Sequence, residues 1–180
     1  MKIVLLLMKY SSILVPILLV VLIYSYNKLV KLRSKVREAL SGVDVQLARR
    51  YELIPDLLDL LDEGREHEAG LLESLKEMNE KRTETLVWET LPQQANEARD
   101  FGRRLKEIIR VLGKNKGAGE AERFKLIGST LKDIEDHLQL ARRYYNAVVR
   151  DYNIARESLP TGLFAALLGF ERAEYFGTND

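Results

Sequence analysis

An apolar run from Ile3 to Tyr24 opens the chain and passes directly into a heptad-patterned segment that begins at Tyr26-Asn27. Roughly 20 helical residues, each rising about 1.5 Å, cover the hydrocarbon core of a bilayer, so the run is long enough to span. A cleaved signal peptide is the alternative, but no small-x-small pattern follows Ile23 and no cysteine is present for lipoprotein processing. The pattern therefore favours a retained membrane anchor that continues as a helical stalk.

The basic residues that flank the run predict its orientation. Only Lys2, Lys9 and the terminal amine lie on its upstream side or within it, whereas five basic residues follow it: Lys28, Lys31, Arg33, Lys35 and Arg37. Because basic flanks stay in the cytoplasm, we expect a single-pass protein of the bacterial inner membrane, with a short N-terminus outside and the bulk of the chain in the cytoplasm.

The composition excludes several classes of function. Lys and Arg number 28 against 27 Asp and Glu, so the basic excess of a nucleic-acid-binding protein is missing and no DNA or RNA partner is expected. The absence of cysteine excludes disulfides, thiolate nucleophiles and thiolate metal sites. No cofactor is expected.

The rest of the chain has a helical pattern throughout. Apolar residues recur at alternating steps of three and four from Leu29 to Ile54 and, without a slip, from Phe124 to Leu159. Two further helices are expected, one from Leu57 to Leu86 whose apolar pattern is weak around Gly64, and a shorter one from Ala95 to Leu112. A period near 3.5 favours coiled-coil-like, left-handed packing. The predicted fold class is all-α: an N-terminal transmembrane helix followed by an antiparallel four-helix, up-and-down bundle.

We divide the chain into an anchor at residues 1–26, a helical bundle at 27–160 and a C-terminal amphipathic, aromatic segment with the tail at 161–180. The segment Tyr51 to Pro55 is ambiguous, because proline disfavours helix in the residue before it yet suits the first turn of a new helix. A tight corner is favoured here, with a kinked continuous helix as the competitor.

Several polar residues lie beside the predicted core rather than opposite it. They are Glu38, Asp44 and Gln46 on the first helix of the bundle and Arg142, Asn146 and Asn153 on the last. Buried polar networks are tolerated only when they are hydrogen-bonded, and they can fix helix register. We favour a structural network, with a ligand or partner site as the alternative and catalysis as the weakest reading.

A zinc-protease motif is excluded at His67-Glu68, because position 71 is Leu where the second histidine is required. No metal site is expected, and no pair of nucleophile and base stands out.

Two blocks of residues resemble the LemA family of bacterial membrane proteins. The first runs from Asn27-Lys-Leu-Val-Lys-Leu-Arg33 through Val43-Asp-Val-Gln-Leu47 to Leu53-Ile-Pro55. The second contains Arg142, Tyr145-Asn146, Val149, Tyr152-Asn153, Pro160, Gly169-Phe170 and Tyr175-Phe176. The resemblance implies a single N-terminal anchor, a cytoplasmic antiparallel four-helix bundle and an association with a membrane metalloprotease.

Aromatic and apolar residues at the expected membrane-proximal end suggest a contact with membrane or with a neighbouring subunit. They are Trp88, Phe164, Leu167, Phe170, Tyr175 and Phe176. The run Gly162 to Phe170 is too short to span, but it suits the headgroup boundary. A cap that closes the end of the bundle is an equal alternative.

Two functions are compatible with these patterns. The first is a non-enzymatic, membrane-anchored helical scaffold, linked to envelope protein quality control, with the lipid bilayer and another membrane protein such as a metalloprotease as partners. The second is a self-assembling homo-oligomer that shapes or remodels membrane, suggested because relatives of the family occur in magnetosome formation.

Overall fold

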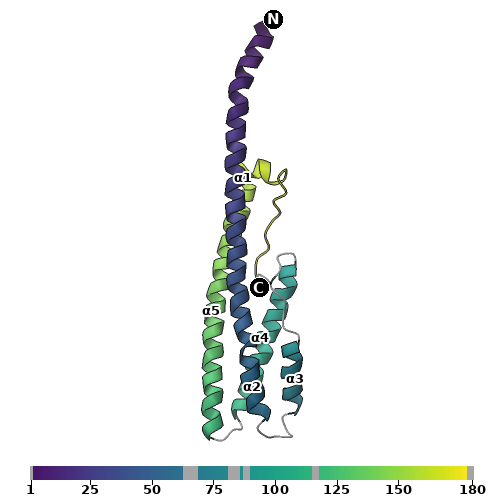
Figure 1. Ribbon diagram of the computed structural model, residues 1–180, viewed down its shortest axis with the longest axis vertical. Helices are drawn as coiled ribbons and strands as arrows, with labels where there is room; N and C mark the ends of the chain where they lie inside the picture. The colour runs from purple at the N-terminus through teal and green to yellow at the C-terminus, as the bar shows by residue number, and fades with distance from the viewer. Residues whose placement is uncertain (1, 63–68, 81–85, 87–89, 115–117, 178–180) are drawn as a thin grey trace. The chain divides into compact units, whose positions relative to one another are not determined.

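The computed structural model describes residues 2–62, 69–80, 86, 90–114 and 118–177. Figure 1 shows the helices, which are α1 (Lys2–Tyr51), α2 (Leu53–Asp62), α3 (Ala69–Glu80), α4 (Leu91–Lys114), α5 (Ala118–Glu157) and α6 (Thr161–Ala165). No β-strand occurs among the described residues. The predicted all-α fold class is confirmed.

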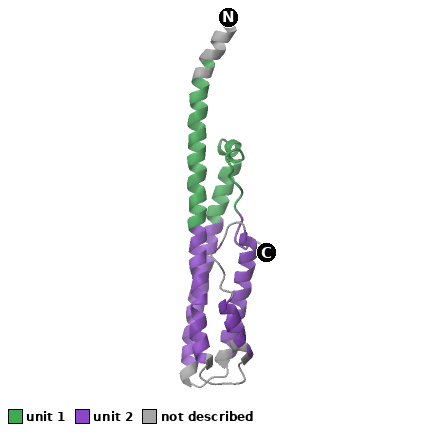
Figure 2. Ribbon diagram, turned by 45° about the vertical axis from the view of Figure 1, so that its right-hand side comes forward, with its two compact units in different colours: residues 1–38, 147–173 green, residues 39–146, 174–180 purple. Residues whose placement is uncertain are grey.

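The chain forms two compact units, which Figure 2 distinguishes by colour. Unit 1 contains residues 1–38 and 147–173, and unit 2 contains residues 39–146 and 174–180. The long helices α1 and α5 each contribute to both units. The division of the sequence at residues 26 and 160 stays a prediction.

Unit 1 joins the apolar start of α1 to the end of α5, to α6 and to the residues that follow it. Its side chains from Ile13 to Val20 are half or more exposed, whereas Leu29 and Val36 on the same helix are fully buried. Tyr152 on α5 and Phe170 beyond α6 are buried as well. The apolar side chains of α1 are therefore exposed near its N-terminus and buried further along the same helix.

Unit 2 has an apolar core to which all of its helices contribute. The core contains Tyr51, Leu53, Ile54, Leu57, Leu60, Leu75, Met78, Leu105, Ile108, Phe124, Ile127, Leu131 and Ile134. Most of these residues come from the stripes spaced by three and four, which the sequence places on the buried faces. Within this unit α2 and α3 pack against each other and run in opposite directions (Figure 1). The helix α4 and the part of α5 in this unit also run in opposite directions (Figure 1).

The tight corner expected between Tyr51 and Pro55 is wrong. Only Glu52 separates α1 from α2, and its backbone N–H still donates to the carbonyl oxygen of Ala48 at 3.3 Å. Pro55 then lies in the first turn of α2, where the backbone has no helical partner for its N–H in any case. The chain reverses instead between α2 and α3, so the helix expected from Leu57 to Leu86 is two helices.

Candidate functional site: two Tyr-Asn pairs that hold the tail segment

The non-helical residues 170–176, called the tail segment below, are held by side chains of α5. In unit 1, Asn153 Nδ2 donates to the carbonyl oxygen of Ala173 at 2.9 Å, and the backbone N–H of Ala173 donates to Asn153 Oδ1 at 3.0 Å. The adjacent Tyr152 hydroxyl donates to the carbonyl oxygen of Glu171 at 2.7 Å. Asn153 and Ala173 are both buried.

The same arrangement recurs in unit 2, seven residues earlier on α5. Asn146 Nδ2 donates to the carbonyl oxygen of Phe176 at 3.2 Å, and the backbone N–H of Phe176 donates to Asn146 Oδ1 at 2.8 Å. The Tyr145 hydroxyl donates to the carbonyl oxygen of Glu174 at 2.8 Å. Each pair therefore captures three backbone groups of the tail segment.

Asparagine suits this contact because its carboxamide presents one acceptor and one donor side by side, as a peptide group does. A tail that leaves helical structure inside a folded protein must find partners for its backbone N–H and C=O groups. The two asparagines supply them without a β-strand. Aspartate could accept at both oxygens but could not donate to the carbonyl groups.

Further contacts fix the ends of the tail segment. Arg156 Nε donates to the carbonyl oxygen of Phe170 at 2.8 Å in unit 1. In unit 2 the Phe176 ring packs edge-on against Tyr145, with centroids 6.5 Å apart, and the Arg142 guanidinium lies 4.7 Å from the same ring centroid. Burial, and to a lesser extent the Glu174 carboxylate, raises the pKa of Tyr145 well above its ordinary value, which keeps the hydroxyl a donor.

A buried ion pair in unit 2 connects three helices. Arg50 of α1 pairs through Nη2 with Glu135 of α5, and its Nη1 donates to the carbonyl oxygen of Ala98 on α4 at 3.0 Å. Lys106 Nζ lies 3.3 Å from the other oxygen of Glu135. Arg50 is 2% exposed, so its charge depends on these partners.

The surroundings of this pair are crowded and rich in cations. A Cβ atom added at Gly102 would lie 2.9 Å from Arg50 Nη1, so a larger residue there would require the guanidinium to shift away from its partners. Burial lowers the pKa of Arg50, although Glu135 opposes the effect. Burial and the nearby charge of Arg50 lower the pKa of Arg142 to about 10.

Sequence reasoning missed Arg50 and Glu135, although a signal was present. Arg50 lies seven residues after Val43 and three after Leu47, so it occupies a core position of the heptad on α1. On α4 the small residues Ala98 and Gly102, four apart, form the space opposite it. An arginine at a core position facing two small residues indicates a buried guanidinium.

The polar residues predicted from sequence divide into two groups. Arg142, Asn146 and Asn153 contact the tail segment, each within its own unit, as described above. The three on α1 make other contacts or none: Asp44 Oδ1 accepts the backbone N–H of Leu86 at 3.4 Å, Gln46 Oε1 accepts from Arg49 at 3.5 Å, and Glu38 is exposed. Their role in fixing helix register stays a prediction.

The residues predicted to contact membrane or subunits differ in exposure. Phe170 and Phe176 are buried, Phe164 and Tyr175 are half-buried, and Leu167 is 83% exposed. Trp88 lies outside the described residues, as do His67 and Glu68. Within the described parts of the chain, no cluster of three or more His, Asp or Glu side chains is placed to hold a metal ion.

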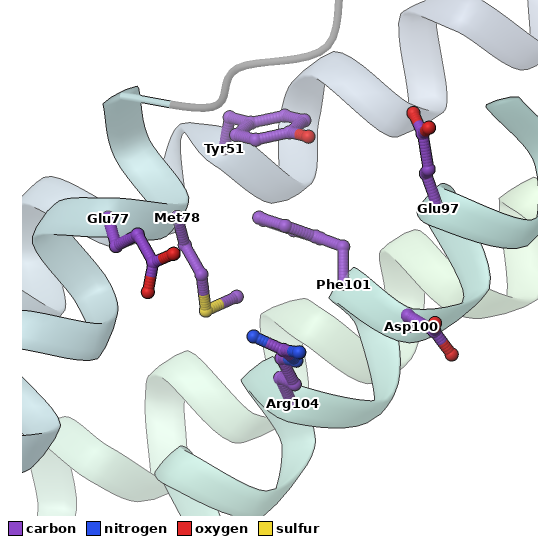
Figure 3. Close-up of a pocket in the computed structure, with 7 residues that line it drawn as sticks. All are labelled: Tyr51, Glu77, Met78, Glu97, Asp100, Phe101 and Arg104. Atoms are coloured by element: carbon purple, nitrogen blue, oxygen red, sulfur yellow. The ribbon is translucent and has the colours of Figure 1, made fainter.

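Figure 3 shows a cavity of about 250 Å³ in unit 2. Its apolar side is formed by Met78 and by the rings of Tyr51 and Phe101, whose centroids are 4.2 Å apart, and Glu77 and Arg104 lie at its charged edge. Cofactor and drug-sized ligand sites begin at about 300 Å³, so this cavity is small for such a ligand.

The long apolar helix, the helical core and the described tail contacts define an all-α, membrane-associated protein. Among the described residues one helix is long and apolar enough to cross a membrane, with a window of mean hydropathy 2.0 in the segment Ile13–Leu60. The LemA family profile matches residues 39–180. The chain belongs to the LemA family.

Curated relatives of the chain include magnetosome proteins. The match to Magnetosome protein MamQ of Magnetospirillum gryphiswaldense is 30% identical over 76 residues, and that to Magnetosome protein MamQ 2 of Paramagnetospirillum magneticum is 32% identical over 76 residues. Each match covers 42% of this chain and 28% of the relative. The likeness therefore concerns less than a third of each relative's length.

Proposed function

We propose that this protein is a non-enzymatic scaffold, anchored in the bacterial inner membrane by a single span and presenting its helical domain to partners in the cytoplasm. The observation that carries the proposal is the change in the exposure of apolar side chains along α1. Its apolar side chains are exposed from Ile13 to Val20 and buried at Leu29 and Val36, both within unit 1. Such exposed apolar surface is stable in lipid and costly in water.

The basic flank supports the cytoplasmic orientation. Lys28, Lys31, Lys35 and Arg37 are exposed on α1 directly after the apolar segment, where their charges can stay in water at the inner surface of the membrane. A membrane metalloprotease, implied by the family resemblance, is the partner that we propose for a role in envelope protein quality control.

Protease treatment of intact spheroplasts tests the sidedness. An epitope at the C-terminus is expected to survive until the membrane is permeabilised with detergent. Digestion in intact spheroplasts would overturn the cytoplasmic placement. Crosslinking in native membranes, with mass-spectrometric identification of neighbours, tests the scaffold role; a protein that crosslinks to no other protein, itself included, would overturn it.

A self-assembling protein that shapes membrane is the second candidate, supported by the relatives named as magnetosome proteins. It predicts a large ring or polymer when the full chain is solubilised in mild detergent. Light scattering after size-exclusion chromatography distinguishes the two candidates, because a monomer or dimer excludes assembly.

A further inference from the structure

Four leucines within and beside α6 are exposed in unit 1. Leu159, Leu163, Leu167 and Leu168 are 75%, 63%, 83% and 37% exposed, and we call them the leucine patch. Ala165, on the same short helix, is 2% exposed. One side of the segment is therefore buried within unit 1, and the leucine patch is exposed.

The local structure around α6 is built to hold this surface in place. The Thr161 hydroxyl contacts the carbonyl oxygens of Ala155 and Ser158, so the turn out of α5 is tied to the end of that helix. After α6, Gly169 adopts φ +69°, a conformation that favours glycine, and Phe170 follows in a buried position. Both ends of the leucine-bearing segment are thus fixed.

A contact to α1 places the segment at the end of the apolar run. Phe170 packs edge-on against Tyr26, with ring centroids 6.0 Å apart, and Tyr26 is two residues beyond the last residue of that run, Tyr24. Figure 1 shows α6 beside α1 in unit 1. Phe170, two residues after Leu168, therefore lies beside the end of the apolar run, and aromatic rings at such a level are typical of a membrane interface.

We infer that the leucine patch inserts into the leaflet from which α1 emerges and so gives the protein a second contact with lipid. The inference rests on the proposed membrane span of α1. The contact of Phe170 with Tyr26, at the end of the exposed apolar run of α1, favours lipid over a protein partner, because an apolar side chain at this level of a membrane-spanning helix meets acyl chains. The segment is too short to cross the membrane and lies at its surface.

The charged residues on either side of the patch balance each other, so we expect the contact with lipid to be hydrophobic rather than electrostatic. Glu157 and Glu171 balance Arg156 and Arg172 along the sequence, so the segment has no basic cluster for anionic headgroups. We therefore expect the same insertion in neutral and in anionic bilayers, and no loss of insertion at high salt.

Tryptophan fluorescence tests the inference in the full chain, reconstituted into dioleoylphosphatidylcholine vesicles with or without brominated acyl chains. Trp88, the single tryptophan, is first replaced by Phe. Leu167→Trp then reports on the patch, and its large exposure leaves room for the indole. Leu140→Trp, at a position 62% exposed and 17 residues before the end of α5, is the matched control outside the membrane.

Brominated lipid is expected to reduce the emission of Leu167→Trp by more than half relative to ordinary lipid and to leave Leu140→Trp unchanged. Equal, small effects on both variants would overturn the inference. So would protection of Leu167→Trp from both brominated lipid and aqueous iodide, because a second protein copy would then cover the patch.

Ile17→Trp, in the apolar part of α1, separates this inference from the proposed function. Ile17 is 56% exposed. Quenching of Ile17→Trp without quenching of Leu167→Trp leaves the anchor intact and refutes the second contact alone. If neither position is quenched, the membrane span itself is wrong, and with it the proposed function.

Discussion

Replacing Asn153 by alanine should release the tail segment from the end of α5. The side chain of Asn153 is the partner of both the N–H and the C=O group of Ala173, a residue that is 1% exposed. Alanine at position 153 removes both partners at once and adds no bulk. The two backbone groups of Ala173 would then be buried without hydrogen bonds.

The size of the effect follows from those two groups. An unpaired buried polar group costs about 1–3 kcal/mol, so two cost roughly 2–6 kcal/mol. The tail segment can escape this penalty by leaving α5 and exposing both groups to water, which caps the cost at the free energy of docking. Even about 2 kcal/mol shifts the docking equilibrium roughly thirty-fold toward the released state, because 1.4 kcal/mol is tenfold.

Hydrogen exchange with mass-spectrometric detection measures this equilibrium in the full chain in detergent. Peptides that contain residues 170–173 should lose protection by roughly thirty-fold or more, since exchange of these amides follows local opening. Peptides from the unit 2 core at residues 124–138 should exchange as before. Asn96→Ala, at an exposed position on α4, is the matched control. Tail protection in Asn153→Ala equal to that in Asn96→Ala would refute the reasoning.

Three further changes test the buried groups. Glu135→Gln removes the anionic partner of buried Arg50 and should lower the free energy of unfolding in urea by about 3–5 kcal/mol. Gly102→Ala forces a Cβ to within 2.9 Å of Arg50 Nη1 and should lower it by about 1–3 kcal/mol. The raised pKa of Tyr145 means that the unfolded chain releases this proton first, so stability is complete below the ordinary value of 10.0 and falls as pH rises above it. Replacing Tyr145 by Phe should reduce that alkaline fall, measured by urea unfolding between about pH 9 and about pH 11.

Each of these changes has a matched control. Arg103→Ala breaks an exposed pair with Asp100 and should cost less than about 1 kcal/mol; a loss as large as that of the buried pair would contradict the argument. Gly42→Ala, where an added Cβ meets nothing within 4 Å, should stabilise α1 by about 0.5–1 kcal/mol, and a similar gain at position 102 would show that no crowding exists there. Tyr144→Phe, on the exposed side of α5, should leave the alkaline fall unchanged.

The helices that the sequence predicts best are those whose apolar spacing is unbroken. On α5 the predicted stripe includes Phe124, Leu131 and Leu138, and all three are buried. The position of the chain reversal is harder to predict, because the same sequence pattern is expected for a proline in the first turn of a helix and for a proline at a corner. The helical hydrogen bond from Glu52 to Ala48 decides between them, and it depends on packing that the pattern does not contain.

The candidate site was only partly predictable for a related reason. Asn146 and Asn153 stand out beside the core stripe of α5, so their importance can be inferred from spacing alone. Their partners are backbone groups of a non-helical segment. Every residue has such backbone groups, so the sequence does not indicate which of them will be the partners. Spacing alone therefore predicts a polar network between helices, whereas in the structure Asn146 and Asn153 bind the backbone of the tail segment.

Asn153 sets how the start of the tail segment is held in unit 1. Its carboxamide partners both backbone groups of Ala173, and Arg156 and Tyr152 partner the carbonyl oxygens of Phe170 and Glu171. The tail segment begins at Phe170, which contacts Tyr26 within unit 1. The hydrogen bonds between Asn153 and Ala173 therefore help to hold Phe170 at the end of the apolar run of α1, and with it the leucine patch that precedes Phe170 in the sequence. Loss of the Asn153 contact should thus weaken the lipid contact of Leu167 without any change in the patch itself.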